Sequence, residues 1–436
     1  MAGSPKPGLI RSIAVTTIGN IAPVVAGLVT APVLAQSLGV DGRGELAAAT
    51  APLLLMMGAI TFGLPESITY HVARGVGRIR SLVVRGSIVL VAAGALATAL
   101  VMLAADQLSG GNAELAHLIS LAAFAITPGL LLGAARGVAA GHELWSLIAA
   151  ERGLAALLRL VLIVGLALTG SLTALSGTLV IALTSVIGGI VYVVLLRRQP
   201  PRPDRFTEEM PRLLRFGLGL WMGTLAGVLL SRLDQIVMVP LSGTFMLGIY
   251  AVAVTISEVV LVFNRAVRDV VFAAESSDGQ LARLSQASRI STLVTTAGAL
   301  GVGVLSVFVV PWLFGDDFSP AVPVIAILLV GIVLGNPGSV AGAGLSARGK
   351  PILRSLSLLV AASVNVLALF LLVPMWGAIG AAFATVIGNI VAGYANIIWL
   401  RVLYKVPIWD FVGIRRRDFA DAIVAMRRVL RRRERS

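Results

Sequence analysis

Cysteine is absent from this 436-residue sequence, and histidine occurs only three times. The lack of cysteine excludes a disulfide framework, a thiolate metal site and a cysteine redox motif. The histidines, His71, His117 and His142, lack the spacing of a zinc site, and no G-x-S-x-G nucleophile elbow is present. We therefore predict no metal site, no cofactor and no enzymatic activity.

Charged residues are also scarce, at 13% of the chain, whereas 57% of the residues are hydrophobic and the mean hydropathy is +0.95. About 20 apolar residues cross the hydrocarbon core of a bilayer as a helix. Long stretches lack Asp, Glu, Lys and Arg altogether: 12–40, 86–105, 160–196, 290–315, 318–347 and 355–400. These stretches are too long for the strands of a membrane barrel, so helices remain as the way to satisfy the backbone in lipid. The sequence predicts an all-α integral membrane protein.

We expect about 12 transmembrane helices. In the first half they are Ile10–Ala35, Leu46–Tyr70, Leu82–Ala104, Ala116–Ala134, Gly153–Thr169 and Leu175–Leu196. In the second half they are Leu213–Leu241, Leu247–Val271, Ile290–Phe314, Ala321–Gly344, Leu356–Val373 and Gly380–Leu400. No predicted outer loop is long enough for a globular catalytic domain, which argues against a membrane glycosyltransferase, ligase or polymerase.

The net charge of +14 is explained by topology and does not indicate a nucleic-acid partner. With a cytoplasmic N-terminus, all of the 35 basic residues except Arg43 and Arg232 fall on the inner side or at inner helix ends. This distribution obeys the positive-inside rule and predicts that both termini are cytoplasmic. The predicted location is the cytoplasmic membrane, crossed many times.

Four regions follow from the distribution of polar residues. We predict a six-helix lobe over 1–200, a cytoplasmic Pro/Arg linker over 201–212, a second six-helix lobe over 213–402 and a basic tail over 403–436. The sequence around Gly39 and Gly44 is echoed weakly around Leu247 and Gly248, which predicts two pseudo-symmetric bundles. Apolar residues recur at helical spacing from Phe419 to Leu430 beside several arginines. That segment is predicted to lie on anionic inner-leaflet lipid, or to serve only as a topological anchor.

Polar and ionisable residues inside the predicted spans are the candidates for function, because leaving a charge in lipid is costly. The substrate candidates are Arg11, Asn20, Arg159, Arg232 and Arg265, and the coupling or charge-balance candidates are Glu66, Asp234 and Glu258. Arginines near inner helix ends, such as Arg11 and Arg159, have the alternative of snorkelling to the interface. The mid-span charges have the alternative of a structural ion pair between helices.

The two groups of candidates suggest a cargo and a coupling mode. Guanidinium groups bind phosphate or diphosphate oxygens through charge-assisted hydrogen bonds, so inward arginines suit an anionic cargo. The carboxylates would balance that charge or carry H⁺ or Na⁺ through the cycle. The residues alone do not choose between these two roles.

Four patches occur in order along the chain and together point to a family. They are Leu38-Gly39 with Gly42–Ala47 and Gly63–Glu66, Arg232–Gln235 with Leu247–Ala253, Leu313–Phe318 with Ala321–Val324, and Ala347–Pro351 with Asn365, Pro374 and Gly377–Ala382. Over roughly residues 10–400 this succession resembles the O-antigen-type, Wzx-like polysaccharide flippases of the multidrug/oligosaccharidyl-lipid/polysaccharide exporter superfamily.

The resemblance implies two six-helix lobes around a central cavity that opens alternately to the two membrane faces. The implied cargo is a polyprenyl-diphosphate-linked oligosaccharide, flipped for surface polysaccharide biosynthesis. Cationic residues line the cavity in such flippases, and Arg11, Arg159, Arg232 and Arg265 are the positions that could match. The alternatives are an ion-coupled drug or metabolite exporter of the same superfamily, and a scaffold of a glycan-synthesis complex that transports nothing.

Overall fold

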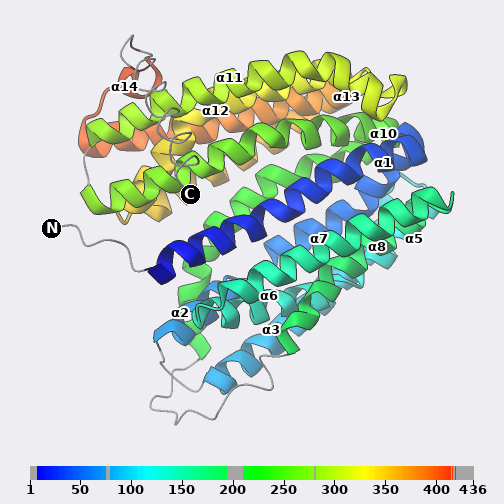
Figure 1. Ribbon diagram of the computed structural model, residues 1–436, viewed down its shortest axis with the longest axis horizontal. Helices are drawn as coiled ribbons and strands as arrows, with labels where there is room; N and C mark the ends of the chain where they lie inside the picture. The colour runs from blue at the N-terminus through cyan, green and yellow to red at the C-terminus, as the bar shows by residue number, and fades with distance from the viewer. Residues whose placement is uncertain are drawn as a thin grey trace. The chain divides into compact units, whose positions relative to one another are not determined.

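The computed structural model describes most of the chain. The described residues are 7–74, 79–193, 210–278, 281–413, 415 and 418. Within the helices, the side chains outside the description are those of 7–18, 20, 79–80, 210–216, 219–220, 262–278 and 281–282. Every regular element of the described residues is a helix, which confirms the predicted all-α class (Figure 1). The linker residues 201–209 and the predicted tail helix from Phe419 to Leu430 lie outside the described residues.

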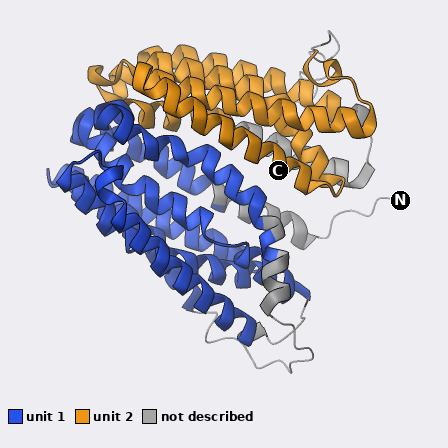
Figure 2. Cartoon of the chain, turned by 180° about the vertical axis from the view of Figure 1, so that it is seen from behind, with its two compact units in different colours: residues 1–248 blue, residues 249–436 orange. Residues whose placement is uncertain are grey.

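The chain forms two compact units, residues 1–248 and 249–436 (Figure 2). The first unit holds α1 (Pro7–Ala59), α2 (Leu64–Arg74), α3 (Ile79–Leu103), α4 (Ala105–Leu108), α5 (Ala113–Ala123), α6 (Ile126–Gly141), α7 (Trp145–Leu168), α8 (Ala174–Ile187) and the 3₁₀ helix η1 (Gly188–Tyr192). Helix α10 (Met210–Asp278) begins in the first unit and continues into the second. The second unit adds α11 (Leu281–Phe314), the 3₁₀ helix η2 (Asp316–Phe318), α12 (Ala321–Ala347), α13 (Pro351–Tyr404) and α14 (Trp409–Val412). The lobe boundary at residues 201–212 stays a prediction.

Three long helices each change direction at one glycine. Gly39 in α1, Gly243 in α10 and Gly377 in α13 have φ values of 68°, 83° and 55°, with backbone conformations that no helix contains. Residues with a Cβ rarely adopt such positive φ values, so glycine makes each sharp turn possible without a loop. Each of these helices therefore supplies two crossings.

The number of apolar helices agrees with about twelve crossings. Within the described ranges, eight helices are long and apolar enough to cross a membrane, and α1, α10 and α13 are among them. Dividing those three at their glycines, and adding α7 with its Glu151, Arg152 and Arg159, accounts for the predicted spans. The protein is a multi-pass membrane protein.

Two predicted spans are interrupted in the structure. The span predicted over Leu46–Tyr70 breaks between α1 and α2, where Phe62 and Gly63 have φ values of 48° and 66°. Pro65 follows in the first turn of α2, where its missing N–H costs no intrahelical hydrogen bond. The span predicted over Ala116–Ala134 divides into α5 and α6, with Pro128 in the first turn of α6. Proline lacks the N–H that would continue the helix, but its ring fits a first turn.

The distribution of side chains suits a lipid solvent. Large apolar residues are highly exposed, including Leu168 at 83%, Trp312 at 81% and Leu103 at 78%. The helix contacts use small residues instead: a methyl group placed on Gly338 of α12 would lie 1.9 Å from the Cα of Gly393 in α13. In lipid the hydrophobic effect does not drive helices together. Small residues instead let the helix backbones approach closely enough for tight packing.

The weak internal echo in the sequence has a counterpart in the first unit. A methyl group on Gly44 would lie 1.9 Å from the carbonyl oxygen of Thr244, and one on Gly248 would lie 2.1 Å from that of Val40. Gly44 lies five residues after the kink at Gly39 and packs against Thr244, the residue that follows the kink at Gly243. Gly248 lies five residues after Gly243 and packs against Val40, the residue that follows Gly39. The Thr244 hydroxyl also donates to Asp41 Oδ1 at 3.0 Å. The two kinks contact each other reciprocally.

Candidate functional site

Three of the predicted site residues cannot be placed by their side chains. Arg11 and Asn20 belong to α1, and Arg265 belongs to α10, but all three side chains lie outside the described residues. Their predicted roles therefore stay predictions, and the remaining five residues carry the description of the site.

Arg159 lies on α7 and is half-buried. Its Nε donates a long hydrogen bond of 3.5 Å to the hydroxyl of Thr184 on α8. Thr184 is fully buried and donates to the carbonyl of Val180 at 2.7 Å. The guanidinium is therefore directed at a hydroxyl of a neighbouring helix, which leaves most of its donors available for an anionic group.

Arg232 and Asp234 lie on the part of α10 that belongs to the first unit. Arg232 is half-buried, whereas Asp234 is only 5% exposed. Asp234 Oδ1 accepts a hydrogen bond from the backbone N–H of Gln235 at 2.8 Å. Burial distinguishes Asp234 from the other predicted carboxylates, because Glu66 on α2 is exposed and Glu258 on α10 is half-buried.

Arg232 and Asp234 share one segment of α10, whereas Glu66, Arg159 and Glu258 lie on other helices or helix segments. Among the described side chains, no hydrogen bond or ion pair joins two of the predicted residues. Arg159, Arg232, Asp234 and Glu66 belong to the first unit and Glu258 to the second. The assignment of substrate and coupling roles to them remains a prediction.

A charged cluster in the first unit was not predicted. Arg136 of α6 donates from Nε and Nη2 to the two carboxylate oxygens of Glu151 on α7, at 3.0 and 2.9 Å. The hydroxyl of Tyr192 in η1 donates to the same carboxylate at 3.3 Å. Glu151 is 3% exposed, so the carboxylate is neutralised and hydrogen-bonded where solvent cannot reach it. A sequence signal existed, because Glu151 directly precedes the basic residue Arg152 at the start of an apolar stretch.

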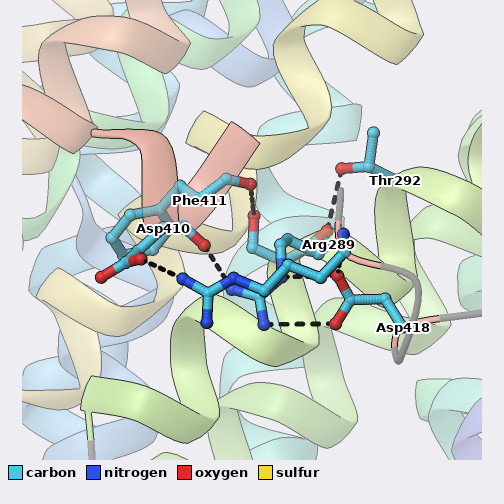
Figure 3. Close-up of polar contacts among 7 residues, drawn as sticks. Arg289, Thr292, Asp410, Phe411 and Asp418 are labelled. Atoms are coloured by element: carbon cyan, nitrogen blue, oxygen red, sulfur yellow. Dashed lines mark hydrogen bonds and ion pairs between the residues drawn. The ribbon is translucent and has the colours of Figure 1, made fainter. Parts of the chain in front are cut away.

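A second charged cluster joins the start of α11 to the tail of the second unit (Figure 3). Arg289, which is 5% exposed, donates from Nε and Nη2 to Asp418 at 2.8 and 3.2 Å. Its Nη1 donates to the carbonyl of Asp410 at 2.5 Å. Arg415 donates from its backbone to Asp418 at 2.7 Å and from its side chain to Asp410 at 2.6 Å. We call these four residues the clasp.

The clasp changes the acidity of its buried carboxyl group. Burial alone would raise the pKa of Asp418, but the hydrogen bonds from Arg289 and from the Arg415 backbone outweigh it and lower the pKa. The carboxylate is therefore charged at neutral pH. Because 129 residues separate Arg289 from Asp418, no local sequence pattern revealed this pair.

Uncharged polar residues form a third cluster, in the second unit. Asn336 of α12 is 1% exposed and donates to the hydroxyls of Ser291 and Thr292 on α11, at 3.2 and 2.9 Å. Such interhelical hydrogen bonds hold membrane helices together. Among the described residues, no group of three or more His, Asp or Glu side chains could hold a metal ion.

The comparison with family models decides the relationship of the chain to known proteins. A model described as "Polysaccharide biosynthesis protein" matches residues 9–272, which is more than half of the chain. The chain belongs to this polysaccharide biosynthesis protein family. The family match includes all eight predicted site residues and the Arg136–Glu151 pair, whereas the clasp lies beyond it.

Solved structures of the same fold agree with the superfamily that the sequence motifs predicted. A structure described as the lipid II flippase MurJ, in an inward closed conformation, has a TM-score of 0.74 at 15% identity and covers 94% of this chain and 91% of its own. An inward-facing multidrug resistance MATE family transporter of the MOP superfamily has a TM-score of 0.66 at 19% identity, with coverages of 89% and 94%.

A third structure, a MOP superfamily transporter from Pyrococcus furiosus, has a TM-score of 0.61 at 17% identity, with coverages of 92% and 96%. No curated protein sequence matches the chain. At these identities the likeness concerns the fold alone. The family match confirms the predicted relationship to polysaccharide biosynthesis proteins, and the chain is a multi-pass membrane protein of that family.

Proposed function

We propose that the protein is a flippase that moves a polyprenyl-diphosphate-linked oligosaccharide across the cytoplasmic membrane for surface polysaccharide biosynthesis. The observation that carries this proposal is the polysaccharide biosynthesis family match over residues 9–272. The fold shared with a protein described as a lipid II flippase supports a lipid-linked cargo. The relatives by structure are described as transporters and a flippase, so the proposed role includes no catalytic step.

The proposed mechanism is alternating access. The sugar-diphosphate head would follow a hydrophilic path while the prenyl chain stays in lipid. Arginines within apolar helices would compensate the diphosphate charge, and Arg159 and Arg232 are the described ones that the family match includes. Arg11, Asn20 and Arg265 are proposed to act with them. Asp234, Glu66 and Glu258 are the proposed carriers of H⁺ or Na⁺.

Reconstituted vesicles test this function. A labelled polyprenyl-diphosphate oligosaccharide is placed in both leaflets, and the fraction reached by a membrane-impermeant lectin is followed with time. Vesicles with protein should expose the inner pool, and vesicles without protein should retain it. A folded protein that moves no lipid-linked oligosaccharide under an imposed H⁺ or Na⁺ gradient would overturn the proposal.

An ion-coupled drug or metabolite exporter is the second candidate, favoured by the fold shared with MATE transporters. Overexpression should then confer drug resistance while surface glycans stay unchanged. If deletion removes the surface glycan but Arg159→Ala and Arg232→Ala variants keep it, a scaffold that transports nothing is indicated instead.

A further inference from the structure

The chain forms a cavity just after α13, in the second unit. Its volume is about 580 Å³, and its lining residues are Arg401, Lys405, Val406, Pro407, Ile408 and Trp409. Residues 405–413, which we call the strap, form most of this wall and follow the last predicted membrane crossing.

Two cations in this cavity lack compensating charge. Arg401 and Lys405 are both exposed and lie one helical turn apart, and within the described residues neither forms an ion pair. Asp410, the next acid along the chain, is bound to Arg415 at 2.6 Å, and Asp418 is bound to Arg289. The cavity therefore presents two positive charges to an anion from outside the described chain.

Exposed apolar side chains lie beside these cations in the chain. Trp409 is 77% exposed, and Val402 and Leu403 of α13 are 65% and 44% exposed. Tryptophan is enriched at the level of the lipid headgroups, where basic residues also meet phosphate. The combination of exposed tryptophan, exposed aliphatic residues and two cations fits a phospholipid better than a soluble anion.

The cavity is held in shape by the protein itself. Phe411 of the strap is fully buried in a core with Leu345 and Leu400, and its carbonyl accepts a hydrogen bond from Ser288 at 3.3 Å. The clasp fixes the strap through Arg289 (Figure 3). Lys405 has a left-handed backbone with φ 58°, and its N–H donates to the carbonyl of Arg401 at 2.8 Å. A preformed wall lowers the ordering cost of binding.

We propose that this cavity binds the phosphate of an anionic phospholipid, with Arg401 and Lys405 on the phosphate and Trp409 beside the glycerol and the first acyl carbons. With the predicted cytoplasmic C-terminus, that lipid belongs to the inner leaflet. The site precedes the predicted amphipathic segment, Phe419–Leu430, in the sequence. It depends neither on the transported cargo nor on the residues proposed for transport.

Native mass spectrometry of the purified full-length protein tests the site, with phosphatidylglycerol and phosphatidylcholine as probes. We expect the wild type to retain phosphatidylglycerol preferentially. Lys405→Gln should weaken that retention about fivefold, and the Arg401→Gln/Lys405→Gln double variant roughly twentyfold. Lys350→Gln is the matched control, because Lys350 is an exposed lysine at the other end of α13. Circular dichroism and gel filtration confirm that the single, exposed Lys405→Gln change leaves the fold intact.

A variant of the clasp separates a built site from general attraction to positive charge. Asp418→Asn removes a negative charge but loosens the strap, so it should weaken phosphatidylglycerol binding. Binding that stays equal or increases in this variant overturns the proposal. Equal losses in Lys350→Gln and Lys405→Gln also overturn it, as does retention in the double variant. Preference of the cavity for a polyprenyl diphosphate over phosphatidylglycerol would assign it to cargo and refute the phospholipid site.

Discussion

Arg136 and Glu151 form a two-pronged ion pair in which both carboxylate oxygens of Glu151 accept hydrogen bonds, at 2.9 and 3.0 Å. The pair joins α6 to α7, and Tyr192 adds η1 to the same carboxylate. Three elements of the first unit, α6, α7 and η1, thus share one charged centre. An arginine that donates two parallel hydrogen bonds to one carboxylate fixes the relative orientation of the two side chains and also binds strongly.

Removing one partner of this pair should destabilise the protein. Glu151→Ala leaves the Arg136 guanidinium without its carboxylate, and loss of one partner of a buried pair typically costs about 3–5 kcal/mol. Since the Arg136 side chain is 36% exposed, we expect about 2 kcal/mol and a lower melting temperature in detergent. Glu143→Ala, which removes an exposed acid nearby, is the control and should leave the melting temperature unchanged. Equal melting temperatures for the two variants would contradict the structural role of the pair.

The clasp should make the strap sensitive to acid. The pKa of Asp418 is below its ordinary value of 3.8 in the folded protein. Its stabilisation is therefore complete above pH 3.8 and is lost as the pH falls through the lower, folded-state pKa. The hydrogen-exchange protection factors of the backbone amides of residues 405–413, which are corrected for the intrinsic pH dependence of exchange, should fall over that acidic interval.

Two variants separate this effect from acid unfolding in general. Asp418→Asn should show low protection factors at every pH and lose the acid-dependent step. Asp316→Asn changes an exposed carboxyl in the same unit and should preserve the wild-type profile. An Asp418→Asn profile that coincides with the wild type would show that Asp418 does not hold the strap.

Because the kinks at Gly39 and Gly243 contact each other closely, one methyl group added to either turn should disturb the contact. Gly44→Ala and Gly248→Ala each place a methyl group about 2 Å from a carbonyl oxygen of the opposite kink, so the turns must move apart. Because the chain has no native cysteine, Asp41→Cys with Thr244→Cys provides a unique disulfide reporter across this contact. Either alanine substitution should slow the formation of that disulfide.

Glycines with free space around them provide the control for this experiment. Gly27 in α1 and Gly227 in α10 have no atom within 4 Å of an added methyl group. Gly27→Ala and Gly227→Ala should leave the cross-linking rate unchanged. If all four alanine variants cross-link at the wild-type rate, the close contact of the two turns is refuted.

Burial distinguishes the proposed coupling residues. Asp234 is 5% exposed, whereas Glu66 is exposed, so only Asp234 loses most of its contact with water. Taking up an ion changes the energy of a buried carboxylate far more than that of a solvated one. Under the proposed flippase function, Asp234→Asn should reduce the dependence of vesicle transport on an H⁺ or Na⁺ gradient, and Glu66→Gln should preserve it. The reverse result would assign coupling to Glu66.

Sequence patterns predicted the features that depend on neighbouring residues. Charge-free stretches predicted the membrane helices, and the small residues around Gly39 and Gly243 coincide with the turns between spans. The break at Phe62 and Gly63 was not predicted, although Pro65 offered a local signal. Hydropathy averages over about twenty residues and does not detect a short interruption within an apolar run.

These local patterns could not predict contacts between residues that are distant in the sequence. Glu151 and Asp418 read as ordinary charges near helix ends or in a polar tail, and their buried pairing depends on how distant helices pack. Asn336 was not among the candidates, and its contacts with Ser291 and Thr292 likewise depend on how α11 and α12 pack. The predicted transport residues were selected because polar or charged side chains are costly in lipid. That cost indicates that a residue has a function, but it does not identify the group that the side chain contacts.

The reciprocal position of Gly44 and Gly248 has a consequence for divergence of the two halves. Each glycine is confined by the main chain of the opposite turn, and a main chain cannot be trimmed by mutation as a side chain can. No substitution at either position can be rescued by a smaller residue at its counterpart. Divergence of the two halves is therefore constrained at this point, because a larger residue at either glycine requires the opposite turn to move as well.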